Sequence, residues 1–123
     1  MKNLNKYSLV DTLKKYAKTN KPLLGICLGM QMLLDESEEF EKTKGIGLIS
    51  GKVIKIPTQD KNNEKLPHVS WNEIKPKNID WNDTILQNIN SQSDMYFVHS
   101  YIAKPTDEND ILSTTTYSDY EFC

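Results

Sequence analysis

The segment 22–31, Pro-Leu-Leu-Gly-Ile-Cys-Leu-Gly-Met-Gln, constrains the fold of this 123-residue chain more than any other segment. An apolar run leads into Gly25-Ile-Cys27-Leu-Gly29, and a helical pattern follows at once. This is the layout of a nucleophile elbow, in which a strand turns sharply into a helix and presents a reactive side chain at the turn. Packing alone does not explain a cysteine between two glycines at such a turn.

The chemistry of a cysteine at this position follows from its surroundings. The thiolate is the nucleophile, and a helix N-terminus favours it through unpaired backbone N–H groups and the helix dipole. Gly25 and Gly29 are expected to allow the tight turn and a close approach of neighbouring backbone. The N–H of Leu28 is expected to point where an oxyanion would form. A buried, inert cysteine is the common alternative, but the two glycines favour a nucleophilic Cys27.

Apolar periodicity predicts the elements on either side of the elbow. An amphipathic helix is expected over residues 4–19, because Leu9, Leu13, Tyr16 and Ala17 recur on one face. A short buried strand at 23–26 and a helix from 29 to about 38 should flank Cys27. The later segments are expected to be a loop at 40–48, an exposed or edge strand at 52–56, a polar turn at 59–64, a semi-extended stretch at 66–74, an irregular region at 78–93 with a short helix near 85–89, strands at 95–103 and 111–117, and the start of a strand at 121–123.

The order of these elements indicates an α/β fold. The strand–helix–strand beginning is typical of a mostly parallel sheet, and the consecutive strands that follow suggest an antiparallel extension. No internal repeat, low-complexity tract or composition break divides the chain. We therefore expect one domain spanning residues 1–123.

Composition excludes several classes of protein. Fifteen lysines, with no arginine, face 17 acidic residues for a net charge of −2, which argues against a nucleic-acid partner. No apolar run is long enough to span a membrane, and the first 20 residues show no signal-peptide pattern, so we expect a cytoplasmic protein. Two cysteines and two histidines show no spacing typical of a metal site, so no metal and no cofactor are expected.

Four segments together resemble class I (triad-type) glutamine amidotransferases, and within that class the glutaminase subunit of imidazole glycerol phosphate synthase. Gly-Ile-Cys-Leu-Gly-Met-Gln at 25–31, followed by Ser-Glu-Glu at 37–39, is similar to the family's elbow. Gly-Ile-Gly-Leu-Ile-Ser-Gly-Lys-Val at 45–53 resembles the segment after the elbow helix. Pro-His-Val-Ser-Trp-Asn at 67–72 and Tyr-Phe-Val-His-Ser-Tyr at 96–101 resemble two later elements. The resemblance implies a flavodoxin-like open sheet.

The resemblance also implies roles for matching residues. Cys27 would attack the side-chain amide of glutamine, release ammonia and leave a glutamyl thioester for hydrolysis. Leu28 would contribute its N–H to the oxyanion hole, and Gln31 and Glu39 would help to hold glutamine. The backbone of three further residues would line the same pocket, namely His99, Ser100 and Tyr101.

The resemblance further implies a heterodimer with a (β/α)8 cyclase subunit. Trp71, Asn72 and Tyr96 would lie toward that partner. The cyclase would receive ammonia through a sheltered tunnel and use it on a phosphorylated ribosyl-imidazole intermediate in histidine synthesis.

Each of these residues also has a simpler interpretation. Glu39 lies in the acidic run 36–41, which could be a solvated face, and Gln31 could be a helix-surface amide. His99 could be a hydrogen-bonded histidine within a strand, and Trp71 could belong to the core. The shared order of the segments favours the functional interpretation.

The chain departs from the family pattern at three places. The family's general base lies in a His-x-Glu segment that this sequence lacks, and its Pro-Gly-x-Gly loop with the preceding β/α unit is also missing. Ser70 replaces the glycine usual before Trp71. We therefore expect a domain truncated at both ends, which alone would have little or no glutaminase activity and poor solubility.

Three other functions remain open. A related amidotransferase could feed ammonia to an enzyme that modifies surface sugars. A degenerate amidotransferase could be retained only to bind a partner, as the missing base suggests. Another cysteine-elbow hydrolase is disfavoured by Gln31 and by Val-His-Ser-Tyr at 98–101.

Overall fold

The computed structural model describes residues 1–57 and 65–123, and the polar turn expected at 59–64 lies outside them. The helices are α1 (Lys2–Lys6), α2 (Leu9–Ala17) and α3 (Leu28–Leu33), with the 3-10 helix η2 at Glu108–Asp110. The strands are β1 (Glu36–Ser37), β2 (Thr43–Lys44), β3 (Gly51–Lys55), β4 (His68–Glu73), β5 (Lys75–Pro76), β6 (Asp94–His99), β7 (Tyr101–Pro105), β8 (Ser113–Tyr117) and β9 (Tyr120–Phe122).

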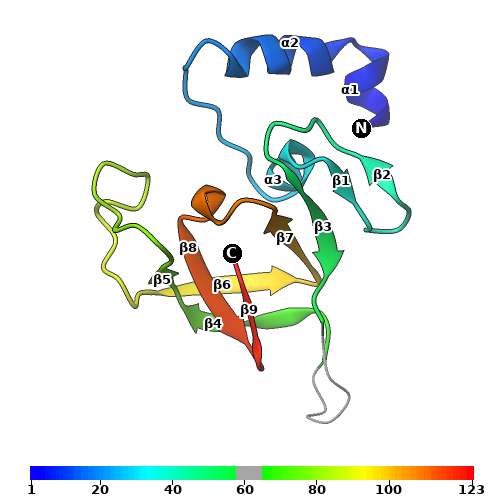
Figure 1. Cartoon of the computed structure of the whole chain (residues 1–123). Helices are drawn as coiled ribbons and strands as arrows, with labels where there is room; N and C mark the ends of the chain where they lie inside the picture. The colour runs from blue at the N-terminus through cyan, green and yellow to red at the C-terminus, as the bar shows by residue number, and fades with distance from the viewer. Residues whose placement is uncertain (58–64) are drawn as a thin grey trace.

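The α/β class expected from the sequence is confirmed, and the strands form three groups. One sheet has the order β2-β1-β3-β7, β4 pairs with β6, and β8 lies between β5 and β9. Within the described residues the parallel pair is β1–β3, and the other pairs are antiparallel. Most of the strand pairing in the described residues is therefore antiparallel, as expected for the extension and not for a mostly parallel sheet. Figure 1 places α1 and α2 at the top, α3 beside the upper end of β3, and β4 and β6 across the lower half.

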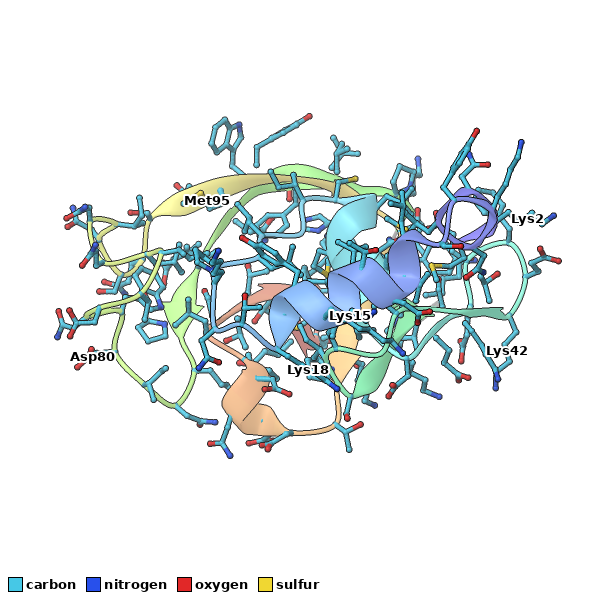
Figure 2. The ribbon with its side chains drawn as sticks, turned by 90° about the horizontal axis from the view of Figure 1, so that it is seen from above. Lys2, Lys15, Lys18, Lys42, Asp80 and Met95 are labelled. Carbon is cyan, nitrogen blue, oxygen red and sulfur yellow. The ribbon has the colours of Figure 1, made fainter. Side chains whose placement is uncertain are left out.

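The first helical segment is broken and lies on the surface. A turn at Tyr7 and Ser8 separates α1 from α2, with Ser8 in a left-handed conformation. No residue of either helix is buried, and Leu9 and Tyr16 of the expected apolar face are exposed. Figure 2, viewed from above, shows α2 crossing over the molecule with Lys15 and Lys18 along it, between Lys2 at one end and Asp80 at the other.

The helix after Cys27 is shorter than the sequence predicts. It ends at Leu33, and Leu34 is already extended, because the carbonyls of both residues accept hydrogen bonds from a loop rather than from the next helical turn. Leu48 N–H and Ile49 N–H donate to Leu33, while Gly47 N–H donates to Leu34. The buried Leu34 side chain packs in a core cluster with Val53 and Ala103. Tertiary contacts therefore end the helix.

Strand β3 corrects the expectation of an exposed or edge strand at 52–56. It lies between β1 and β7, and Val53 and Ile56 are almost fully buried. Lys52 points outward and forms an ion pair with Glu38 at 3.6 Å. The lysines of this segment show that one face of the strand meets solvent. They do not show whether the strand lies at an edge, because an edge strand is one whose backbone groups are unpaired in the plane of the sheet.

The strand expected at 95–103 is two strands with different partners. β6 pairs with β4 and β7 pairs with β3, and the change of partner falls at Ser100. Ile102 of β7 packs with Ile56 and Phe122 in a second core cluster. The region 78–93 is irregular as expected, with turns instead of the short helix near 85–89, and residues 23–26 have no strand partner in the described part of the chain.

Candidate active site

Cys27 sits at a strained turn immediately before α3. Its backbone has φ 54° and ψ −118°, a combination that costs a non-glycine residue about 1–3 kcal/mol and is concentrated at functional sites. The turn is held by Gly29 N–H, which donates to Ile26 at 2.8 Å, and by Gln31 N–H, which donates to Cys27 at 3.2 Å. The cysteine is a free, exposed thiol. The structure therefore has the strained turn and the following helix of the predicted elbow, but not its buried strand. Leu23, Leu24 and Ile26 are exposed, and residues 23–26 have no strand partner in the described part of the chain.

The two glycines beside Cys27 have different structural roles. A Cβ on Gly25 would lie 2.8 Å from the carbonyl oxygen of Gly29 and 2.8 Å from the nitrogen of Met30. These are backbone atoms of α3, so they cannot move aside as a side chain could. A Cβ on Gly29 would meet nothing within 4 Å. Of the two glycines beside Cys27, Gly25 is therefore the one required for a close approach of backbone.

A small cavity lies beside the elbow and brings together three of the predicted site residues. Its volume is about 140 Å³, which suits a ligand of amino-acid size better than a larger one. Leu28, Gln31 and Glu39 line it, together with Ser37 and Lys44. The last two were not predicted from the sequence, and the short strands that place them, β1 and β2, give no periodic signal.

Glu39 differs from its neighbours in the acidic run. Glu36 pairs with Lys42 at 3.1 Å, and Glu38 pairs with Lys52 at 3.6 Å. Glu39 forms no ion pair within the described residues, and its N–H donates to Ser37 Oγ at 3.2 Å. The solvated-face interpretation therefore fits two of these carboxylates, whereas Glu39 faces the cavity.

The three other predicted pocket residues lie at the junction of β6 and β7. None of them lines the cavity beside Cys27. His99 Nδ1 is 3.0 Å from the carbonyl oxygen of Tyr101, and Ile56 N–H donates to the carbonyl of Ser100 at 2.9 Å. Hydrogen bonds therefore hold this segment in place where the chain passes from the β4–β6 pair to the sheet that contains β3 and β7.

An exposed apolar surface covers the outer face of the β4–β6 pair, which we call the hairpin face. It consists of Val69, Trp71, Tyr96 and Val98, each more than half exposed. Trp71 and Tyr96 lie opposite each other in the register, with ring centroids 5.4 Å apart. Asn72 lies on the opposite face, because successive side chains of a strand alternate. The structure therefore groups two of the three predicted interface residues and separates Asn72 from them.

The inner face of the same hairpin holds a polar cluster that was not predicted from the sequence. His68 is fully buried, and its ring nitrogens lie within hydrogen-bond distance of His99, Ser70 and Asn72. Burial is the main cause that lowers the pKa of His99, and the nearby His68 lowers it further. The alternation of polar residues at 68, 70 and 72 is the signal that could have revealed this cluster.

The described residues contain no group of three or more His, Cys, Asp or Glu placed to hold a metal ion. Among the helices described here, none has the length and apolar character needed to cross a membrane.

Comparison with known proteins identifies relatives of the chain. Residues 5–123 match the family model for glutamine amidotransferase class-I. Imidazole glycerol phosphate synthase subunit HisH 1 of Legionella pneumophila (strain Lens) is 43% identical over 121 residues, covering 95% of this chain and 57% of the relative. Subunit HisH of Pelagibacter ubique (strain HTCC1062) is 51% identical over 116 residues, covering 94% and 54%. Subunit HisH of Aquifex aeolicus (strain VF5) is 38% identical over 120 residues, covering 98% and 55%. The chain spans about half the length of the curated relatives it matches.

The unequal surroundings of the two glycines give a matched pair of variants. Gly25→Ala is expected to lower the free energy of unfolding by about 1–3 kcal/mol, because its Cβ would overlap the backbone of α3. Gly29→Ala should be neutral or slightly stabilising, because alanine favours a helix and has open space here. Urea unfolding of both variants checks the prediction. Equal losses of stability would contradict it.

Proposed function

The chain belongs to the class I glutamine amidotransferase family, and on that premise we propose that it carries the nucleophile and glutamine-binding part of a glutaminase that supplies ammonia for histidine biosynthesis. The relatives named above, each a subunit of imidazole glycerol phosphate synthase, support the pathway. We further propose that residues 1–123 form one partial domain and that the protein acts in the cytoplasm.

The observation that carries the proposal is the cavity beside the elbow. Free glutamine has an ammonium group, a carboxylate and a side-chain amide. Glu39 and Lys44 offer opposite charges for the first two groups, and Gln31 offers an amide partner for the third. Leu28 lines the same cavity and directly follows Cys27, so its N–H suits the oxyanion position.

The proposed reaction follows from these positions. The Cys27 thiolate attacks the side-chain amide carbon of glutamine, and the Leu28 N–H stabilises the resulting oxyanion. The C–N bond breaks as the leaving nitrogen takes up a proton and departs as ammonia. Water then hydrolyses the thioester, releasing glutamate and the free thiol.

The proton for the leaving group needs a donor other than the two histidines of this chain. His68 and His99 lie within hydrogen-bond distance of each other, and neither lines the cavity. We therefore propose that the general base comes from outside this sequence and that the chain alone turns glutamine over poorly. Loss of a general acid–base group typically costs about 10²–10⁴-fold in rate.

We propose that the hairpin face binds a (β/α)8 cyclase subunit. An exposed tryptophan and tyrosine in contact, flanked by two valines, have the composition of an interface centre. Asn72 would act on this interface indirectly, through the polar cluster beneath it. The proposal includes Trp71 and Tyr96 as the direct contacts.

Covalent labelling tests the nucleophile and the glutamine site. A diazoketone analogue of glutamine is expected to alkylate Cys27 and to leave Cys123 unmodified, with protection by L-glutamine. Glu39→Gln should slow labelling by about 10-fold or more, because a charged hydrogen bond is lost, whereas Glu38→Gln should not. Mass spectrometry of the labelled peptides gives the rates. Equal labelling of both cysteines, or equal effects of the two glutamate variants, would contradict the proposal.

Binding measurements test the partner surface. Trp71→Ala and Tyr96→Ala are each expected to weaken binding to the cyclase subunit by about 2 kcal/mol, roughly 30-fold in Kd, because central aromatic residues dominate interfaces. Ile85→Ala, which removes an exposed side chain in the region 78–93, should leave Kd unchanged. Titration calorimetry measures all three. An unchanged Kd for both aromatic variants would place the interface elsewhere.

A further inference from the structure

Two hydroxyl side chains, those of Ser37 and Thr43, lie opposite each other where strands β1 and β2 pair. The antiparallel register matches Ser37 with Thr43, so both side chains lie on the same face of the sheet. Both also line the cavity beside the elbow. The loop 38–42 joins the two strands, and it carries Glu39, which lines the same cavity. The two hydroxyl groups therefore lie at the start and at the end of the loop that presents Glu39.

A row of hydrogen bonds connects the two hydroxyl groups through the backbone of this loop. Thr43 Oγ1 donates to the carbonyl oxygen of Glu41 at 3.1 Å, and Glu41 N–H donates to the carbonyl oxygen of Glu39 at 2.8 Å. Glu39 N–H in turn donates to Ser37 Oγ at 3.2 Å. Both backbone groups of Glu39 are thus bonded within this row. We call Ser37 and Thr43 the hydroxyl clamp.

Other kinds of support for Glu39 are weak among the described residues. Regular strand pairing ends at Glu38, whose N–H donates to the carbonyl of Val53 at 3.0 Å. Within the described part of the chain, Glu39 itself forms no ion pair. The next residue, Phe40, has φ 62°, a left-handed conformation that is unfavourable for a phenylalanine. Its side chain is 99% exposed, so it contributes almost no packing that could hold the loop. The hydroxyl clamp is therefore the main restraint on Glu39.

Restraint of Glu39 matters because a charged hydrogen bond depends on distance and direction. A carboxylate that moves with a free loop must lose that freedom when a ligand binds, and this cost weakens binding. We propose that Ser37 and Thr43 are positioning residues that hold Glu39 at the cavity for the ammonium group of the substrate amino acid. That Glu39 meets an ammonium group rests on the proposed function above, whereas its restraint by the clamp rests on the hydrogen bonds alone.

Saturation labelling by the diazoketone analogue of glutamine tests the positioning role. Ser37→Ala and Thr43→Val each remove one hydroxyl group. Each is expected to raise the half-saturating concentration of the analogue about 3–10-fold, the effect expected for one lost hydrogen bond. The labelling rate at saturation should stay unchanged, because Cys27 and its turn are left as they are. Ser37→Thr and Thr43→Ser keep the hydroxyl groups and should restore the original half-saturating concentration.

Two controls separate the positioning of Glu39 from a general loss of stability. Ser113→Ala removes a strand hydroxyl that donates to the carbonyl of Lys75 at 3.1 Å and does not line the cavity, so it should leave half-saturation unchanged. In the Glu39→Ala background, Ser37→Ala and Thr43→Val should have no further effect, because the group that they position is gone. Equal effects of the two clamp variants with and without Glu39 would overturn the proposal.

Amide exchange measured by NMR tests the restraint of the loop without any glutamine analogue. In the original chain, Glu39 N–H is expected to exchange with water more slowly than Phe40 N–H, which has no acceptor among the described residues. Ser37→Ala should remove this protection of Glu39, and Ser37→Thr should keep it. Exchange of Glu39 N–H that is equally fast in the original chain and in Ser37→Ala would overturn the proposal.

The outcomes distinguish the clamp from the proposed function. Protection of Glu39 that is lost in Ser37→Ala, in a chain whose Cys27 the analogue does not label, would overturn the proposed function and support the restraint of Glu39 by the clamp. Labelling of Cys27 with unchanged half-saturation in both Ser37→Ala and Thr43→Val would support the proposed function and overturn the positioning role.

Discussion

The backbone strain at Cys27 is the constraint on which the candidate site depends. A cysteine at φ 54° is unfavourable on its own, so the surrounding structure must hold it there. The close approach of Gly25 to the first turn of α3 provides that support, together with two backbone hydrogen bonds across the turn. The same turn leads into α3, whose Leu28 and Gln31 line the cavity together with Glu39 from the loop after β1. Cys27 itself does not line the cavity, but it directly precedes Leu28, which does.

A second constraint is the change of partner strand at Ser100. Here the chain leaves the β4–β6 hairpin and joins β3, so one turn links the elbow-side sheet to the hairpin. The two histidines lie at this turn, directly beneath the hairpin face that carries Trp71 and Tyr96. A partner bound to that face would therefore contact the outer side of strands whose inner side carries His68 and His99.

The elbow, the α/β class and the family could be predicted from the sequence because they depend on local signals. Gly25 and Cys27 lie between an apolar run and a helical pattern, and this local pattern predicts the turn. Four segments in the order typical of the family predict the family. The interior position of β3 could not be predicted, because Lys52 reports which face meets solvent and says nothing about neighbouring strands. The break at Ser100 and the early end of α3 arise from contacts with distant segments. The different surroundings of the glutamates at 36–39 could not be predicted either. Glu36 and Glu38 form ion pairs with lysines that the fold brings near them, whereas Glu39 lines the cavity.

Glutamine binding to the Cys27→Ala chain tests the central claim most directly, because this variant can bind the substrate without reacting. Backbone amide NMR spectra would be recorded as L-glutamine is added, with L-asparagine as the matched control. The account predicts saturable shifts that concentrate at the cavity residues Leu28, Gln31, Glu39 and Lys44, and much weaker shifts with asparagine. Shifts absent from these residues, or equal for the two amino acids, would contradict the claim that the elbow and its cavity form a glutamine site.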